Sequence, residues 1–177
     1  MSAVGRAAVD IEEFEAVVRL HWSRVFRFVL ASVRDPDAAG SLTQDCFFRA
    51  WRARERFRGE CSVQAWLLRI AVNLARDHAR NRRLQFWKRA RVPVADLDFA
   101  VAGATPEERA LAGERLRAVW EAMEKLPGRQ RTVFLLRFVE DMDLLEIASA
   151  TGMKEGTVKA HLFRALHAVR ERVRRTE

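Results

Sequence analysis

The sequence contains no tyrosine, two cysteines and four prolines among its 177 residues. The cysteines, Cys46 and Cys61, lack a CxxC spacing and are too few for a disulfide scaffold, so we expect free thiols. No stretch approaches the roughly 20 apolar residues of a membrane span, and the start of the chain lacks the apolar run of a signal peptide. We therefore expect a cytoplasmic protein. Alternating apolar and polar runs are also missing, which favours an all-α fold.

The histidines and carboxylates form no catalytic or metal-binding pattern. His161 and His167 are six residues apart, which is wrong for one helical face, and no HExxH sequence occurs. The acidic residues lie mainly at expected helix caps and solvent faces, without a paired carboxylate or nucleophile. The sequence predicts a protein with no enzyme activity, no metal and no cofactor.

Positive charge is present in excess and is unevenly distributed. Residues 1–92 hold 18 Lys/Arg and 10 Asp/Glu, residues 93–113 hold 1 and 4, and residues 114–177 hold 13 and 10, so the three segments carry +8, −3 and +3. Two basic segments on either side of an acidic spacer indicate two modules that face a polyanion. Nucleic acid is the first partner to consider.

Helical periodicity dominates the first half of the chain. Apolar spacing predicts helices over about 11–33, from Asp35 to about 54, and from Ser62 onward, with a loop over 55–61. The third helix ends in a dense basic run, six Lys/Arg between residues 80 and 91. One stripe of the third helix is predicted to be buried, made of Val63, Trp66, Leu67, Ile70, Ala71 and Leu74.

The second half begins after a segment, 93–104, that loses both helical periodicity and basic charge and is predicted to be a linker. Helices are expected from Thr105 to the Pro127-Gly128 break and over about 130–140. A short apolar helix then follows a capping box made by Asp143 and Glu146. It stops at Thr151-Gly152, and a long basic helix follows.

The last two helices have the arrangement of a helix-turn-helix, in which the second helix enters a major groove. Gly152 permits the positive φ of the tight turn. Side chains expected to face inward are Ala148, Val158, Leu162, Leu166 and Val169. Lys159, His161 and Arg164 lie where side chains reach base edges or phosphates. The same pattern also fits an ordinary α-hairpin inside a helical bundle.

Aromatic residues lie among arginines in the first module, and aromatic rings between basic residues stack on the bases of single strands. Trp66 belongs to the predicted buried stripe, so packing in the core is the favoured interpretation for it. Phe57, in the loop between Arg56 and Arg58, is a candidate for stacking or for a wedge, and packing remains the alternative.

Two long stretches resemble the bacterial RNA polymerase sigma factor family, specifically its small two-domain extracytoplasmic-function (ECF) group. They are DAAGSLTQDCFFRAWRARERFRGECSVQAWLLRIAVNLARDHARNRR and LPGRQRTVFLLRFVEDMDLLEIASATGMKEGTVKAHLFRAL, with a non-helical spacer between them. The resemblance runs from about Phe14 to Val173. It implies two small helical domains, 10–92 and 105–177, joined by a flexible linker, the second a helix-turn-helix.

The resemblance also implies a division of tasks. The first domain binds the polymerase clamp through its second helix and melts the promoter −10 element, and the last domain reads the −35 element. Residues at the family's polymerase-binding positions are Leu42, Gln44, Asp45, Phe48, Arg49 and Trp51. Residues at its −10 positions are Arg56, Phe57, Arg58, Ser62, Asn73, Arg76 and Arg80. Residues at its −35 positions are Lys159, His161, Phe163 and Arg164.

The partners implied by the resemblance are core RNA polymerase, promoter DNA and an anti-sigma factor that covers these surfaces. A stand-alone regulator of the LuxR type is the main alternative, because its DNA-binding helices are similar to TGMKEGTVKAHL. That alternative makes residues 14–92 a sensor or dimerisation domain and gives their arginine-rich helix no task. A basic helical nuclease is a more distant alternative.

Overall fold

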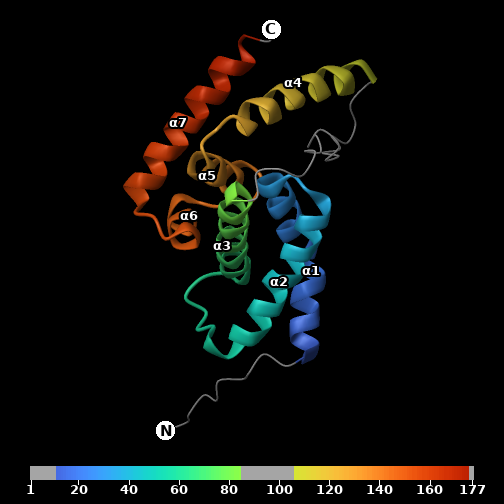
Figure 1. The fold of residues 1–177 in the computed structure, drawn as a ribbon, viewed down its shortest axis with the longest axis vertical. Helices are drawn as coiled ribbons and strands as arrows, with labels where there is room; N and C mark the ends of the chain where they lie inside the picture. The colour runs from blue at the N-terminus through green and yellow to red at the C-terminus, as the bar shows by residue number, and fades with distance from the viewer. Residues whose placement is uncertain (1–10, 85–105, 176–177) are drawn as a thin grey trace. The chain divides into compact units, whose positions relative to one another are not determined.

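The computed structural model describes residues 11–84 and 106–175, and these residues are helical apart from short connections (Figure 1). They contain no strand, so the predicted all-α fold is confirmed. The helices belong to two compact units, α1 to α3 and, apart from the last three residues of α6, α4 to α7, each of which is described by itself. The predicted linker 93–104 and the basic run beyond Leu84 lie outside the described residues, as do Phe86 and Trp87, two further aromatic residues among the arginines of the first module.

The first unit is a three-helix bundle of α1 (Ile11–Val33), α2 (Pro36–Ala53) and α3 (Val63–Leu84), in which each helix packs on the other two. The predicted starts of α2 and α3 are confirmed by their caps. Asp35 accepts a hydrogen bond from the Ala38 backbone N–H at 3.0 Å, and the Ser62 hydroxyl accepts one from the Ala65 N–H at 3.1 Å. Each cap satisfies a backbone donor that the first helical turn leaves free.

The buried face of α3 differs from the predicted stripe. Its fully buried side chains are Ala65, Leu67, Leu68, Ala71, Val72, Leu74 and Ala75, whereas Val63, Trp66 and Ile70 are only half-buried. At about 100° per residue, the observed face is rotated by about a quarter turn from the predicted one. Both α1 and α2 pack on α3, so its buried arc is wide and its centre is set by two neighbours. The prediction that Trp66 lies in the core is therefore wrong.

The second unit consists of α4 (Pro106–Glu124), α5 (Gly128–Phe138), α6 (Leu144–Thr151) and α7 (Glu155–Val173), with α7 packed on α4 and α5. The predicted capping box is confirmed. The Glu146 N–H donates to Asp143 at 2.8 Å, and the Asp143 N–H donates to the Glu146 carboxylate at 2.9 Å. These two bonds fix where α6 begins.

The helix-turn-helix is formed by α6, Gly152 and α7 (Figure 1). Gly152 ends α6 with a φ of 71°, in the left-handed region, and its N–H donates to Ala148 O at 2.9 Å. Val158 and Val169 are buried as predicted, but Leu162 and Leu166 are half-buried, and Ala165 is fully buried in their place. A small residue at the centre of the buried face lets α7 lie close to its neighbours.

An arginine joins α4 to α5. Arg131 donates through Nη2 to the carbonyl oxygen of Glu124, the last residue of α4, at 2.6 Å and to that of Leu126 in the following turn at 3.2 Å. The Glu124 carbonyl is among the acceptors that the last turn of a helix leaves unsatisfied. The charged donor therefore fixes the angle at which α5 leaves the Pro127-Gly128 break.

We expect Gly152→Ala and Gly156→Ala to change stability in opposite directions. Neither glycine has an atom within 4 Å of a built Cβ, so the difference comes from backbone conformation. Alanine at the left-handed position costs about 1 to 2 kcal/mol, whereas alanine inside α7 gains up to about 1 kcal/mol. Urea unfolding followed by circular dichroism measures both variants. Equal changes in the free energy of unfolding would contradict the assigned turn.

Candidate nucleic-acid and partner interfaces

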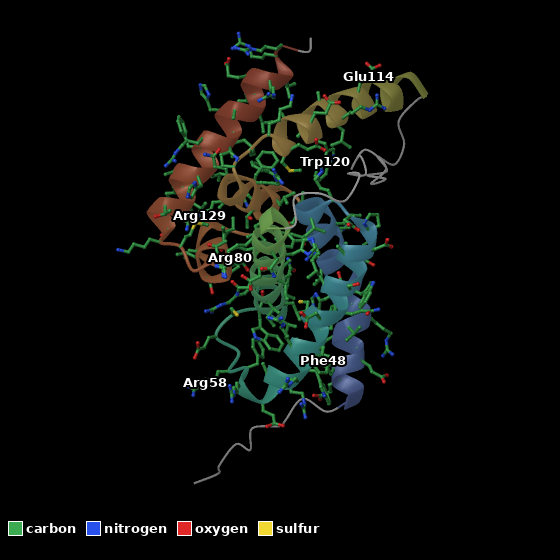
Figure 2. The ribbon with its side chains drawn as sticks, in the orientation of Figure 1. Phe48, Arg58, Arg80, Glu114, Trp120 and Arg129 are labelled. Atoms are coloured by element: carbon green, nitrogen blue, oxygen red, sulfur yellow. The ribbon has the colours of Figure 1, made fainter. Side chains whose placement is uncertain are left out.

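The rotation of α3 brings most of its predicted DNA-binding residues onto one exposed face. Asn73, Arg76 and Arg80 lie, together with exposed Arg69, within an arc of about 60° on an ideal helix, opposite the buried face. Figure 2 shows Arg80 on α3 and Arg58 in the connection that precedes it. The Arg76 guanidinium donates to the Asn73 side-chain oxygen at 2.9 Å. These side chains form a polar, positively charged strip along α3.

An aromatic pair stands at the start of this strip. The rings of Phe57 and Trp66 have centroids 4.8 Å apart with an interplanar angle of 31°. Trp66 lies two helical turns before Asn73, on the same side of α3. The pair and the strip to Arg80 together extend over about 21 Å at 1.5 Å per residue.

The connection before α3 is ordered by several local interactions. It begins with the 3₁₀ helix η1 (Arg54–Arg56). The N–H of Phe57, the next residue, donates to Arg54 O at 3.1 Å. Gly59 has a φ of 71°, and Ser62 closes the loop by capping α3. Arg56, Arg58 and Ser62 are exposed, while Phe57 is half-buried against Trp66. The Phe57 ring is therefore held against Trp66 and does not project freely from the loop.

The outer face of α2 carries the predicted partner-binding residues around Phe48, which is 59% exposed (Figure 2). The Arg52 guanidinium lies 5.8 Å from the centre of the Phe48 ring. On the same face, Arg49 and Asp45 form an ion pair at 3.0 Å. Exposed ion pairs within a helix stabilise by only about 0.3 to 0.5 kcal/mol, so Asp45 exchanges its partner at little cost. Gln44 is exposed beside this group.

The two remaining residues of the predicted α2 set, Leu42 and Trp51, are half-buried on opposite edges of this face. The Trp51 ring packs edge-on against Phe14 of α1, with centroids 5.1 Å apart. Its other side is covered by the Arg54 guanidinium, 3.7 Å from the ring centre. Trp51 is therefore engaged within the unit, which leaves Phe48 as the exposed aromatic group of α2.

The four predicted −35 residues occupy both flanks of α7. Lys159 and Phe163 lie on one flank and His161 and Arg164 on the other, with Ala160 between them. Lys159 and His161 are about 200° apart. Phe163 is 71% exposed, and Lys159 pairs with Glu155 at 2.8 Å. A helix inserted in a groove faces two walls, so residues on both flanks are able to contact DNA.

His161 differs from its basic neighbours in its environment. His161 is half-buried, and its Nδ1 atom is buried with no hydrogen-bond partner among the described residues. Burial first, and then the positive charges of Arg164 and of Arg129 at the start of α5, lower the pKa of His161 from its ordinary value. Figure 2 labels Arg129. The His161 imidazole is therefore uncharged at neutral pH.

The two thiols have different surroundings. Cys46 is fully buried in α2 and donates to Leu67 O at 3.4 Å. Burial, and then the negative charge of Asp45, raises the pKa of the Cys46 thiol to about 12, against a smaller opposing effect of Arg49. Cys61 is half-buried in the loop before α3. The described residues include no cluster of metal-ligating side chains, and no helix among them is long and apolar enough to cross a membrane.

Comparison with known proteins assigns the same two units to one family. Residues 17–85 match sigma-70 region 2, and residues 116–169 match sigma-70, region 4. The RNA polymerase sigma-H factor of Pseudomonas aeruginosa is 30% identical over 168 residues, which cover 90% of this chain and 86% of the relative. The ECF RNA polymerase sigma-E factor of Escherichia coli is 30% identical over 177 residues, which cover 93% of this chain and 88% of the relative.

The chain belongs to the ECF group of the sigma-70 family of RNA polymerase sigma factors. The fold of this sigma factor is similar to that of the sigma factor RpoE from Bartonella quintana, solved in complex with the anti-sigma factor NepR. The TM-score is 0.72 at 21% identity, over 93% of this chain and 98% of the other. The LuxR-type alternative gains no support, because residues 17–85 match sigma-70 region 2 rather than a sensor domain.

Some features of the sigma factor's candidate interfaces were not predicted from the sequence. The Phe57–Trp66 pair requires the loop to fold back onto α3, and the proximity of Arg129 to His161 requires α5 to pack on α7. Neither contact leaves a periodic signal. Arg52 was recognisable in principle, because it follows Phe48 by four residues on the same helical face.

We expect one of the two thiols to react in the native chain and both in denaturant. At pH 8 a thiol of pKa about 12 is about 1 part in 10,000 thiolate, and Cys46 is also enclosed. Raising the pH increases its thiolate fraction tenfold per unit until the pKa is reached. Titration with a coloured disulfide reagent measures the reactive thiols. The control Cys61→Ser should leave the native chain unreactive, and fast native labelling of that variant would contradict the burial of Cys46.

Proposed function

We propose that this sigma factor binds core RNA polymerase, directs it to promoters through their −10 and −35 elements and initiates transcription without catalysing a reaction itself. It acts in the cytoplasm, where polymerase and promoter DNA are found. The observation that carries the proposal is the presence of two different basic faces in one chain. One is the aromatic and basic strip of α3, suited to a single strand, and the other is the helix-turn-helix, suited to a duplex.

The α3 strip is proposed to hold the opened −10 element. Arg76 and Arg80 attract phosphates, Asn73 offers polar atoms to bases, and the Phe57–Trp66 pair offers a stacking platform. Exposed Arg56, Arg58 and Ser62 complete the site at its loop end. Unstacking a base costs a few kcal/mol, and stacking on an aromatic ring returns about 1 to 3 kcal/mol. Binding energy of this size opens a base step without ATP.

The α7 helix is proposed to read the −35 element from the major groove. Phe163 presents an apolar surface suited to a thymine methyl group, and Arg164 presents the forked donor that matches guanine. Lys159 pairs with Glu155 in the free chain, and this exposed pair is weak enough to be replaced by a phosphate. His161 completes the set from the opposite flank.

The outer face of α2 is proposed to bind the polymerase clamp. Phe48 is the exposed aromatic anchor, and Gln44, Asp45 and Arg49 form a polar border around it. Aromatic anchors surrounded by polar side chains are typical of residues that dominate binding energy. Leu42 and Trp51 hold the edges of this face in place, Trp51 through its contacts with Phe14 and Arg54.

An anti-sigma factor is proposed as a further partner. RpoE from Bartonella quintana, which shares the fold, was solved in complex with its anti-sigma factor NepR. In the second unit of this chain, two apolar residues outside the predicted sites are exposed, Phe138 at 52% and Leu145 at 67%. They offer an apolar surface that a second protein would bury. A membrane-anchored protein encoded beside this chain is the natural candidate to test by co-purification.

Reconstituted transcription tests the proposed function. The chain is mixed with core RNA polymerase, and run-off transcripts are mapped on a library of genomic fragments. We expect new transcripts whose start sites share upstream −35 and −10 sequences. Tight binding of the free chain to duplex DNA, with no specific transcript on any fragment, would contradict the proposal.

Substitutions at α2 and α7 should separate the two tasks. Phe48→Ala is expected to weaken polymerase binding by about 2 kcal/mol or more, while leaving −35 selectivity intact. Arg164→Ala is expected to weaken −35 recognition by about 1 to 3 kcal/mol, while leaving polymerase binding intact. Fluorescence anisotropy measures both affinities. Leu20→Ala and Arg117→Ala are matched controls, because both residues are exposed and lie outside the predicted sites. Equal effects of Phe48→Ala and Arg164→Ala in both assays would sink the assignment.

The loop before α3 should matter for the opened strand. Arg58→Ala is expected to weaken binding of the holoenzyme to a single-stranded −10 oligonucleotide and to lower the salt dependence by about one phosphate contact, a slope change of about 0.7. Binding to a closed −35 duplex should not change. Arg19→Ala provides the control, since Arg19 is exposed on α1 and paired with Glu15. An equal loss from Arg19→Ala would show that only net charge matters.

A further inference from the structure

We propose that His161 acts at the −35 interface as an uncharged hydrogen-bond donor, offering Nε2–H to an acceptor on the DNA while Nδ1 stays unprotonated inside the protein. The proposal rests on the proposed role of α7 as the recognition helix. It assigns His161 a chemistry different from that of Lys159 and Arg164, the two cations in the predicted −35 set. The acceptor is a phosphate oxygen or a base-edge atom such as purine N7, guanine O6 or thymine O4.

The position of the ring selects the tautomer. Nδ1 is buried and has no hydrogen-bond partner among the described residues, whereas His161 as a whole is only half-buried. A neutral imidazole carries a single N–H. Burying that N–H without an acceptor costs the free energy of removing the donor from water. The positive charges of Arg164 and Arg129 act on the ring. They oppose a second proton on the ring, and because Nδ1 has no acceptor among the described residues, the single proton is assigned to Nε2.

The charge state follows from the same surroundings. A second proton would place an N–H at the enclosed Nδ1 and a full positive charge near two arginines. Burial and those two charges lower the pKa of His161, so the ring is uncharged at pH 7 and above. The titratable and charged groups that act on it are Arg164 of α7 and Arg129 of α5. An uncharged donor contributes through a hydrogen bond, whose strength depends on direction, and adds no net charge to the interface.

The location of His161 gives this donor a use. Together with Arg164 it occupies the flank of α7 opposite Lys159 and Phe163, with Ala160 between the flanks. A contact on this flank reaches one wall of the groove, and the ring is fixed there by its half-burial. An anchored ring presents its donor along one direction. Donor groups such as adenine N6 or cytosine N4 are excluded as partners, so a contact of His161 with a base edge contributes to specificity, whereas a contact with a phosphate fixes register.

Four binding measurements test the proposal, using holoenzyme and a −35 duplex selected by it from a random-sequence pool. His161→Met removes the donor and is expected to weaken binding about three- to tenfold, without changing the salt dependence. His161→Gln restores a donor near the Nε2 position and should recover most of the affinity. His161→Lys adds a cation and should raise the salt slope by about 0.9. His167→Met is the matched control on the exposed side of the same helix and should bind as the unchanged chain does.

The source of the acceptor is separated by changing the DNA. If it is a base edge, the difference between the unchanged chain and His161→Met should disappear when one base pair is substituted or one purine is replaced by its 7-deaza analogue. If it is a phosphate, the difference should disappear when one linkage becomes an uncharged methylphosphonate that removes an acceptor oxygen. A difference that persists through both scans would overturn the assignment of a DNA acceptor.

The tautomer is measured directly in the full chain. Nitrogen-15 NMR at pH 7.5 should show an unprotonated Nδ1 and a protonated Nε2 for His161. A protonated Nδ1, or a drop in salt slope of about one contact in His161→Met, would overturn the proposal. Failure to select any duplex would contradict the proposed function and the proposal with it. A selected duplex that all His161 variants bind equally would contradict the proposal alone.

Discussion

The orientation of α3 about its own axis is the constraint on which the first unit depends. Leu67, Leu68, Ala71 and Val72 are buried where α1 and α2 both pack on this helix, and together they leave one arc of α3 in solvent. Because side chains on a helix are spaced at fixed angles, burial of these residues places Asn73, Arg76 and Arg80 on the opposite arc. The same rotation moves Trp66 out of the core to the edge of that arc, where Phe57 packs on it. Hydrophobic packing thus positions the polar side chains that are proposed to meet DNA.

Most of the charged pairs on these surfaces are weak and replaceable, and this suits proteins that exchange partners. Asp45 with Arg49 and Glu155 with Lys159 are exposed pairs within single helices, which stabilise the free chain by a fraction of a kcal/mol. Phosphates or a partner's side chains displace them at little cost. The capping contacts are different, since Asp143 with Glu146 and Arg131 with the end of α4 satisfy backbone groups that would otherwise lose their partners. The ion pairs at the candidate interfaces are therefore exchangeable, whereas the capping contacts fix where the helices begin and end.

The two units present different chemistry to nucleic acid. The α3 face combines an aromatic pair with cations in a line, an arrangement that tolerates any base and tracks a flexible strand. The α7 face instead distributes an aromatic ring, two cations and an uncharged imidazole over both flanks of one helix, which suits the fixed geometry of a groove. Promoter recognition by a sigma factor needs both kinds of contact, one with an opened strand and one with an intact duplex.

The sequence by itself determined the helices, their caps and the family. Local signals, such as Asp35 before Pro36, Asp143 with Glu146, and Gly152, depend on neighbouring residues alone, and the structure confirms each of them. The candidate residues came from the resemblance to the family, and helical position also pointed to Lys159, His161 and Arg164. The sequence did not determine how far α3 rotates, that Trp51 is enclosed by Phe14 and Arg54, or that Arg129 acts on His161. Only the tertiary structure decided these three features. Each depends on which side of a helix its neighbours cover, and several sides are partly apolar, so the packing of the whole unit selects the side that is buried.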